Sequence, residues 1–419
     1  MKKQRRKFLS GMGAGLCMAC VGTAAHALRL GLDDGASLMN PCLGALPDGL
    51  RGHELVRRAF AGLEPRHVWD CHAHLLGNGD SGSGCWINPQ LESVLYPRQY
   101  LQKKFFLNAA CVDEQQFRVD RDFVDRLSGH IEAFPPGAGL MLLAFDQTYR
   151  EDGSLDKSRA AFHVPNAYAA RVAQANPGRL RYVCSVHPYR RDVTEALQAA
   201  AVDGAVAVKW LPSAMGIDPG SPRCDRFYAE AARLGLPLIT HAGEERAVKG
   251  AHQQHFGNPL RLRRALEQGV KVVVAHCATM GEDRDLDRGP SGRYRESFEL
   301  FARMMDEPQW EGRLYGDISA IVQTNRATYL PRIVERDAWH HRLFNGSDYP
   351  LPGVMPLFSV DTLVERKWLA AKEATIIKQL REYNPLVFDF VLKRTLRIHG
   401  RHLPDAIFET GKFFLRQPA

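Results

Sequence analysis

The stretch HVWDCHAH, residues 67–74, joins a short apolar run to a cluster of polar side chains. The run predicts a buried strand near residues 67–72. Alternate residues of a strand point to the same side, so His72 and His74 are expected to project side by side. A lone His-x-His pair is a weak signal, but two imidazoles placed in this way suit a metal ion.

Seven more short apolar runs follow this one and alternate with segments of helical pattern. Such alternation predicts βαβ units and a parallel sheet. Eight strands with intervening helices are what a closed (β/α)8 barrel, or TIM barrel, requires, so an α/β fold of this type is expected. The seven later runs lie at residues 139–145, 181–186, 204–210, 236–241, 271–276, 314–319 and 341–348.

Polar residues stand at the carboxyl ends of five of the predicted strands. Burying such groups without partners is costly, so their position in apolar runs needs a cause. The carboxyl ends of parallel barrel strands meet at one mouth, where barrels of this type keep their active sites. We therefore expect one site at that mouth. Its candidate residues are His72, His74, Lys209, His241, His276 and Asp348.

These nitrogen and carboxylate ligands favour a divalent metal ion. Zn²⁺ is the expected ion, with Mn²⁺ and Fe²⁺ compatible with the same ligands. Asp70 is expected either to support the histidine pair from behind or to hold the end of the strand. His187 and Arg190 follow the third strand, and for both a structural role is favoured over a contact with substrate.

Six motifs stand out along the chain: DCHAH at 70–74, VKWLPSAMGIDP at 208–219, ITHAGEE at 239–245, VVAHCATMG at 273–281, GDISA at 316–320 and NGSDYPLPG at 345–353. In these motifs the chain resembles the amidohydrolase superfamily, and in particular its amidohydrolase-related branch of metal-dependent hydrolases and non-oxidative decarboxylases. The resemblance runs from residue 67 to about residue 390. Its motifs are specific for the superfamily and weak for the substrate.

The resemblance implies roles for the candidate residues. It implies that His276 either binds a second metal or polarises the substrate. Three roles are open for Lys209: a carbamylated ligand that bridges two metals, a contact to a substrate carboxylate, or a structural salt bridge. One metal ion, or two, is therefore expected. The metal ligands that the resemblance implies are His72, His74, His241 and Asp348.

Together these features predict a metal-dependent hydrolase of a small amide, ester or lactone. In the expected mechanism the metal acidifies a water molecule, Asp348 moves its proton to the leaving group, and His276 polarises the carbonyl. One alternative is a metal-dependent decarboxylase of an aromatic or unsaturated carboxylic acid, because the same ligands can polarise a carboxylated ring. A second alternative is a non-catalytic metal- or ligand-binding protein of the periplasm.

The first 27 residues predict an export signal. Arg5-Arg6 followed by Lys7-Phe8-Leu9 is typical of a twin-arginine signal, which an exporter of folded proteins reads. Ala25-His26-Ala27 is typical of a cleavage site. An ordinary secretory signal and a lipid anchor at Cys20 are the alternatives. The protein is thus predicted to be periplasmic or otherwise exported, with the twin-arginine machinery as a partner.

The mature chain is expected to contain an N-terminal extension at 28–66, the barrel at 67–400 and a C-terminal tail at 401–419. The net charge is +8, with 55 basic and 47 acidic residues, and five of the basic ones precede residue 8. The remaining excess is small and forms no basic stripe, which argues against a nucleic-acid partner. The apolar run of the signal is too short and glycine-rich for a stable membrane span. A small-molecule substrate is expected, and a homo-oligomer is left open.

Two further features concern the loops and the cysteines. The glycine-rich segment after the first strand, with Gly77, Gly79, Gly82 and Gly84, predicts either a lid or a flexible surface loop. The seven cysteines that follow the signal show no tight pairing and are odd in number, so neither a zinc finger nor a disulfide framework is expected. Most are predicted to be small buried residues, including Cys71 and Cys277 beside the candidate ligands.

Overall fold

Eight parallel strands close into a barrel in the computed structural model, which describes residues 38–248 and 251–415. Single bridges from Cys184 to Val208 and from Ala73 to Tyr349 join the two parallel sheets into one ring. The predicted export signal lies outside the described residues. In spatial order the strands are β1 Trp69–His74, β3 Gly139–Leu143, β5 Leu180–Val183, β6 Val208–Trp210, β7 Leu238–His241, β8 Val272–Ala275, β11 Leu314–Asp317 and β12 Leu343–Phe344.

All eight strands overlap the ranges predicted from the apolar runs, which confirms the TIM-barrel prediction. The last strand is much shorter than the predicted range of 341–348. Its chain leaves the ladder after Phe344 and bends toward β1, where the Asp348 backbone N–H donates to the His72 carbonyl over 2.7 Å. This bend brings the end of the last strand against the first.

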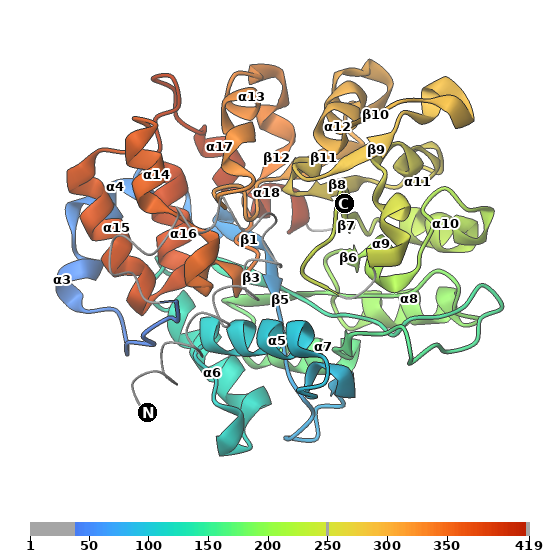
Figure 1. Cartoon of the computed structure of the whole chain (residues 1–419), viewed down its shortest axis with the longest axis horizontal. Coiled ribbons are helices and arrows are strands. Elements are labelled where there is room, and N and C mark those ends of the chain that lie inside the picture. Colours follow the sequence, from blue (N-terminus) through green and yellow to red (C-terminus); the bar gives the residue numbers. More distant parts are fainter. Residues whose placement is uncertain (1–37, 249–250, 416–419) are drawn as a thin grey trace, which may run out of the picture.

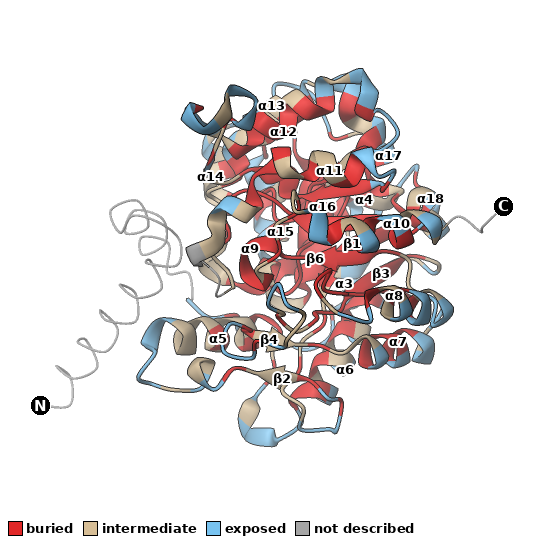
Figure 2. Ribbon diagram, turned by 90° about the vertical axis from the view of Figure 1, so that its right-hand side faces the viewer, coloured by how far each residue is buried: buried red, intermediate tan, exposed pale blue. Residues whose placement is uncertain are grey.

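The helices form an outer layer around the strands (Figure 1). Figure 2 shows buried residues concentrated on the strands and on the inner faces of the helices, while exposed residues gather at the periphery. No helix within the described ranges is both long and apolar enough to cross a membrane. The longer helices are α5 Pro97–Ala109, α6 Val119–Ile131, α7 Asn166–Ala175, α8 Val193–Val202, α10 Asp225–Arg233, α12 Ser297–Asp306, α15 Ala371–Tyr383 and α16 Pro385–Thr395. The shorter ones are α3 Asp48–Arg51, α4 Glu54–Phe60, α9 Pro212–Met215, α11 Arg263–Glu267, α13 Leu330–Val334, α14 Val360–Glu365, α17 Asp405–Phe408 and α18 Gly411–Phe414.

The interior of the barrel holds its own apolar cluster, separate from the larger core between strands and helices. Ala207, Ile239 and the partly buried Tyr315 belong to this inner cluster. Residues two positions further along a strand face the same side. The inner face therefore continues to Lys209, His241 and Asp317, one layer closer to the carboxyl ends. Alternation along ordinary strands thus carries these polar side chains to the mouth.

Segments at both ends of the described chain pack on the barrel. In the predicted N-terminal extension, α4 lies beside α16, with the Phe60 and Phe390 rings stacked 4.5 Å apart. In the predicted C-terminal tail, α18 places Phe413 and Phe414 against Phe344, at ring distances of 4.7 and 5.4 Å. The tail thus supplies side chains to the barrel end that lies away from the candidate site.

A disulfide joins Cys42, in the N-terminal extension, to Cys111, just after α5. The expectation of no disulfide was wrong for this pair. The two cysteines are 69 positions apart, and such a separation leaves no spacing pattern to read. The other cysteines of the described chain are all free and buried, as predicted. They are Cys71, Cys85, Cys184, Cys224 and Cys277.

Candidate active site

The first strand turns its histidines into the barrel mouth through a local irregularity. Pairing between β1 and β3 shifts register between Asp70 and Ala73. Trp69 and Cys71 belong to the inner apolar cluster, whereas His72 and His74 line the cavity at the mouth. An inserted residue of this kind changes the face that later side chains point to.

Asp70 holds this irregular segment in place. Its carboxylate accepts hydrogen bonds from the backbone N–H groups of His72 and Ser347, both at 2.9 Å. Burial raises the pKa of Asp70 to about 6, against the opposing effect of these hydrogen bonds. The residue ties β1 to the segment that carries Asp348 through backbone hydrogen bonds, which favours the second of its two expected roles, holding the end of the strand.

Asp348 is the centre of the candidate site. Its Oδ1 lies 3.1 Å from His74 Nε2 and 3.5 Å from His72 Nε2, and its Oδ2 lies 3.6 Å from His276 Nε2. One donor atom from each of His72, His276 and Asp348 falls within 4.8 Å of the other two. Burial would raise the pKa of Asp348, but the surrounding histidines hold it well below its usual range. The carboxylate is therefore ionised.

Asp317 and Ser319 orient two of these histidines, and neither was predicted as a site residue. Asp317 Oδ2 lies 2.9 Å from His72 Nδ1, and its Oδ1 accepts the His276 backbone N–H. The Ser319 carbonyl lies 2.9 Å from His276 Nδ1. Because both partners accept, each Nδ1 carries the proton and each Nε2 is left with its lone pair toward Asp348.

The position of Asp317 could have been read from the sequence. It ends β11 as His241 ends β7, and so follows the same pattern of a polar residue after an apolar run. Burial would raise its pKa, yet the interaction and hydrogen bond with His72, together with the hydrogen bond from Ser319, hold that pKa far below the usual range. An ionised carboxylate behind a histidine fixes the ring and raises its basicity toward a metal.

Lys209 reaches the same cluster from β6. Its Nζ lies 2.9 Å from His72 Nε2, and the side chain is buried. Burial lowers the pKa of Lys209, while Asp317 and Asp348 act in the opposite sense. The structure thus places Lys209 beside the donor atoms, and its role as a metal ligand or a substrate contact stays a prediction.

His241 borders the cluster without joining it. Its ring centroid is 5.4 Å from that of His276. Its Nε2 lies 3.3 Å from the Glu244 carbonyl and its Nδ1 lies 3.5 Å from Glu245 Oε2. Burial and the charge of Arg326 lower the pKa of His241 to about 3. Of the six predicted residues, five are connected by contacts that run through His72 and Asp348, and His241 lines the same cavity at their edge.

The backbone at the site is held in an uncommon conformation. His276, Cys277 and Ala278 have φ values of 55°, 50° and 52°, and Asp348 has a φ of 64°. Non-glycine residues seldom adopt the left-handed region, and such outliers cluster at functional sites. At this mouth the strain falls on the two predicted catalytic residues, His276 and Asp348.

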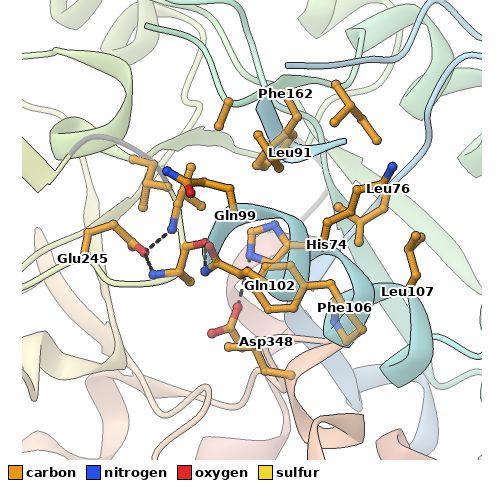
Figure 3. A pocket seen from close by; sticks show the side chains of 18 of the residues that line it. His74, Leu76, Leu91, Gln99, Gln102, Phe106, Leu107, Phe162, Glu245 and Asp348 are labelled. Atoms are coloured by element: carbon orange, nitrogen blue, oxygen red, sulfur yellow. Dashed lines mark hydrogen bonds and ion pairs between the residues drawn. The ribbon is translucent and has the colours of Figure 1, made fainter. Parts of the chain in front are cut away.

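A mostly apolar cavity of about 1150 Å³, its mouth included, opens above the cluster. Helix α5 forms one wall, and Figure 3 shows Gln102 and Phe106 of this helix close to His74 and Asp348. The glycine-rich segment begins beside the same cavity. Asp120 accepts hydrogen bonds from the Asn78 and Gly79 N–H groups, at 2.7 and 3.1 Å. These bonds anchor the start of the segment to α6, and Gly77 lines the cavity.

His187 and Arg190 serve the fold. His187 Nε2 lies 3.0 Å from the Met215 carbonyl, and its Nδ1 accepts the Tyr189 N–H. Arg190 pairs with Asp146 and Asp192. These partners favour the structural role for both residues.

The donor set fits a divalent cation. Two imidazole Nε2 atoms and a carboxylate face one point, and each imidazole is held from behind by a hydrogen-bond acceptor. Histidine and carboxylate ligands with such support are typical of catalytic zinc sites and related metal sites. His72, His276 and Asp348 would hold the ion, with His74, Lys209 and His241 adjacent.

Comparison with known proteins identifies the family of the chain. The family model Amidohydro_2, described as amidohydrolase, matches residues 69–374. No curated protein matches the chain. Members of this family are enzymes that include hydrolases and decarboxylases, and they typically bind a divalent metal ion.

Three solved structures illustrate the structural similarity. An uncharacterised TIM-barrel protein from Bordetella bronchiseptica is 16% identical, with 77% of this chain and 99% of that chain covered and a TM-score of 0.45. A probable 2-pyrone-4,6-dicarboxylic acid hydrolase from Acinetobacter baumannii is 15% identical (76% and 96% covered, TM-score 0.42). A 2,6-dihydroxybenzoate decarboxylase from Rhizobium is 13% identical (75% and 98% covered, TM-score 0.37). All three TM-scores are below 0.5, so the assignment rests on the family model: the chain belongs to the amidohydrolase family.

Proposed function

We propose that this protein is a metal-dependent hydrolase that cleaves a small amide, ester or lactone. The observation that carries the proposal is the convergence of His72, His276 and Asp348 at the mouth of the barrel, beneath a mostly apolar cavity. Zn²⁺ is the proposed ion because two imidazoles and a carboxylate with an open position suit it.

Different parts of the site have different roles in the proposed hydrolysis. A divalent cation held here would acidify water and polarise a carbonyl oxygen. Asp348 faces the histidines with both oxygens, so its carboxylate is placed to accept a proton from water and to return it to the leaving atom. Most of the cavity wall is apolar, which suits the apolar part of a small substrate.

His276 is better suited to hold the metal than to donate a hydrogen bond to the substrate. Its Nδ1 donates to the Ser319 carbonyl, which leaves Nε2 without a proton. Burial, with the charge of Arg326, also keeps the pKa of His276 well below its usual range, so that the ring stays neutral. We therefore assign His276 to the ligands, and polarisation of the carbonyl falls to the metal.

A product assay separates hydrolysis from decarboxylation. The metal-loaded protein is incubated in ¹⁸O-labelled water with a panel of lactones, esters and amides, and separately with hydroxybenzoates. Hydrolysis predicts release of acid with ¹⁸O in the new carboxyl group. Release of carbon dioxide without ¹⁸O incorporation would overturn the hydrolase and support the decarboxylase. Failure to turn over either panel would favour a binding protein.

We also propose that the protein is exported in folded form by the twin-arginine route. Two observations support this: the Arg5-Arg6 motif, and the Cys42–Cys111 disulfide, since such bonds persist in oxidising compartments. In cell fractionation, replacing Arg5 and Arg6 together by lysine should retain the protein in the cytoplasm. Unchanged export of that variant would contradict this route.

A further inference from the structure

Residues 345–348 carry the chain from the end of β12 to Asp348. Three of their backbone groups bond to β1, among them the Asn345 carbonyl, which accepts the Cys71 N–H at 3.1 Å. These bonds fix the path of the segment along the first strand. A fourth group of the segment, the Gly346 carbonyl, is bonded to a different part of the fold.

Lys393 holds the Gly346 carbonyl from a helix. Its Nζ donates to that oxygen over 2.7 Å, and the side chain, which comes from α16, is fully buried. The contact therefore joins α16 to the chain two residues before Asp348. A hydrogen bond from an ionised donor is roughly twice as strong as one between neutral groups.

Gly346 also packs directly against the residues around the candidate ligands. A Cβ atom on Gly346 would lie 2.6 Å from the His72 Cβ and 3.3 Å from the Ser319 Cβ. The segment is thus confined between α16 and two residues of the site. A displacement of Gly346 would be passed to His72 as well as to Asp348.

Asp348 needs such confinement because of its backbone conformation. Its φ of 64° lies in the left-handed region. A non-glycine residue keeps this conformation only where its surroundings determine it by several contacts. The bond between Lys393 and Gly346 is one of the contacts that do so.

Stability alone gives little reason for a buried ammonium at this position. Lys393 pairs with Asp389, one turn earlier on α16, at 2.7 Å, and both side chains are buried. Asp389 Oδ1 has no hydrogen-bond partner among residues 38–248 and 251–415. Burial raises the pKa of Asp389 to about 7, against the opposing charge of Lys393. Replacing a buried ion pair by apolar residues is often neutral or stabilising, so a contact outside the pair gives a better reason for it.

We propose that Lys393 is a positioning residue of the site. By holding the Gly346 carbonyl it keeps the Asp348 carboxylate opposite His72 and His276, where the three can bind a divalent cation. This inference rests on the proposed metal site, and it concerns a residue that touches neither the cation nor the substrate. Lys393 and Asp389 also lie beyond residue 374, where the match to the family model ends.

The affinity of the full chain for Zn²⁺ tests the proposal, measured by competition with a chromophoric chelator and alongside a thermal scan of the metal-free protein. The principal variant combines Lys393→Met with Asp389→Leu, which removes both buried charges at similar volume. Its unfolding temperature should equal or exceed that of the unmodified protein. Its Kd for Zn²⁺ should nevertheless rise by about 10-fold or more, the usual effect of losing a group that supports a ligand.

Lys393→Gln is a second variant that does not depend on an apolar replacement. Its side chain is one bond shorter, which withdraws the donor from Gly346 while an amide remains for Asp389. The Kd should rise in this variant too. Asp389→Asn keeps the ammonium and its bond to Gly346, so its Kd should stay within about 3-fold of the unmodified value. The surface control is Lys378→Met, which removes an exposed ammonium that pairs with Asp361 and should leave the Kd unchanged.

The outcomes separate this proposal from the proposed function. Tight binding of Zn²⁺ by the unmodified protein and equally tight binding by the folded double variant or by Lys393→Gln would overturn the role of Lys393 alone. A loss of affinity in Asp389→Asn as large as in the double variant would assign the effect to the ion pair and also overturn that role. No binding of Zn²⁺ by the unmodified protein would overturn the metal site and this proposal together.

Discussion

The two ends of the barrel are built from the same strands but in opposite ways. At the amino end, α18 closes the barrel with Phe414, whose ring lies 5.4 Å from that of Phe344. At the carboxyl end, His72, His276 and Asp348 face an open cavity, on a backbone with left-handed non-glycine residues. One end is filled by packing, and the other is held by hydrogen bonds around buried charges.

This difference indicates that the amino end mainly stabilises the fold and that the carboxyl end carries the candidate active site. Close-packed apolar side chains at the amino end stabilise the fold. At the carboxyl end, His276, Cys277, Ala278 and Asp348 have strained, left-handed φ values, and such values cluster at functional sites. Substitutions at the two ends should therefore separate activity from stability.

The largest effect is expected from Asp348→Asn at the open end. Loss of the proton acceptor should lower kcat/KM by about 1000-fold. The thermal midpoint should change little, because a neutral amide can still occupy the space of the carboxylate. Steady-state kinetics on a substrate found in the product assay checks this, with the surface variant Asp125→Asn as a control. Activity equal to that of the control would contradict the role of Asp348.

The disulfide between Cys42 and Cys111 holds the end of α5, the helix that forms one wall of the cavity. Replacing both Cys42 and Cys111 by serine should lower the free energy of unfolding by about 4 kcal/mol, since the crosslink spans 69 positions and restricts the unfolded chain. Denaturant titration measures the change, and a matched control is the reduced, alkylated unmodified protein. Equal stability of the double variant and the oxidised protein would show that the disulfide adds nothing.

At the amino end of the barrel, Phe414→Ala should lower the free energy of unfolding and leave the catalytic rate nearly unchanged. The side chain is buried against Phe344, so its truncation should cost about 3 kcal/mol. Its kcat per folded molecule should stay within about 2-fold of the unmodified protein, because Phe414 lines neither of the two cavities that border the candidate ligands. A loss of kcat comparable to that of Asp348→Asn would break the proposed division between the two ends.

The smallest effect concerns a histidine beside the open end that belongs to the fold. Burial lowers the pKa of His187 to about 4. Because its folded pKa lies below the unfolded value, its contribution is present above about pH 6.5 and is lost as the pH falls toward 4. Between pH 7 and pH 5 the loss should be about 2 kcal/mol.

Denaturant titrations of His187→Gln and of the unmodified protein across this range measure that contribution. The free energy of unfolding should fall less steeply with decreasing pH in the variant than in the unmodified protein. The difference in slope should correspond to up to about one bound proton per molecule. Identical slopes would mean that His187 does not titrate as its burial requires.

Much of the site could be predicted because ordinary strands obey the alternation of side chains. Lys209 and His241 lie two positions after inner-cluster residues, as the apolar runs implied. His72 and His74 lie at the mouth as predicted, but a shift of register in β1 places them there, and no sequence pattern predicts that shift. Asp317 followed the same rule as His241 and could have been found with it.

Other features depend on contacts that are distant in the sequence. Lys393 stands in α16, and nothing in the local sequence marks it as the donor to a carbonyl 47 positions away. The Cys42–Cys111 pair and the packing of Phe414 on Phe344 likewise arise only once the barrel has closed. The sequence predicted His241 as a metal ligand and His276 as a catalytic group. Which of the two binds the metal also depends on which ring nitrogens face Asp348.

The most direct test of the account is the metal content of the purified protein, measured by mass spectrometry alongside activity. We predict at least one equivalent of a divalent metal per chain, loss of both metal and activity on treatment with a chelator, and recovery of both with Zn²⁺. The variant His72→Ala should retain less than about a tenth of the metal. Full activity in a protein free of metal would contradict the central claim that this barrel mouth is a metal site.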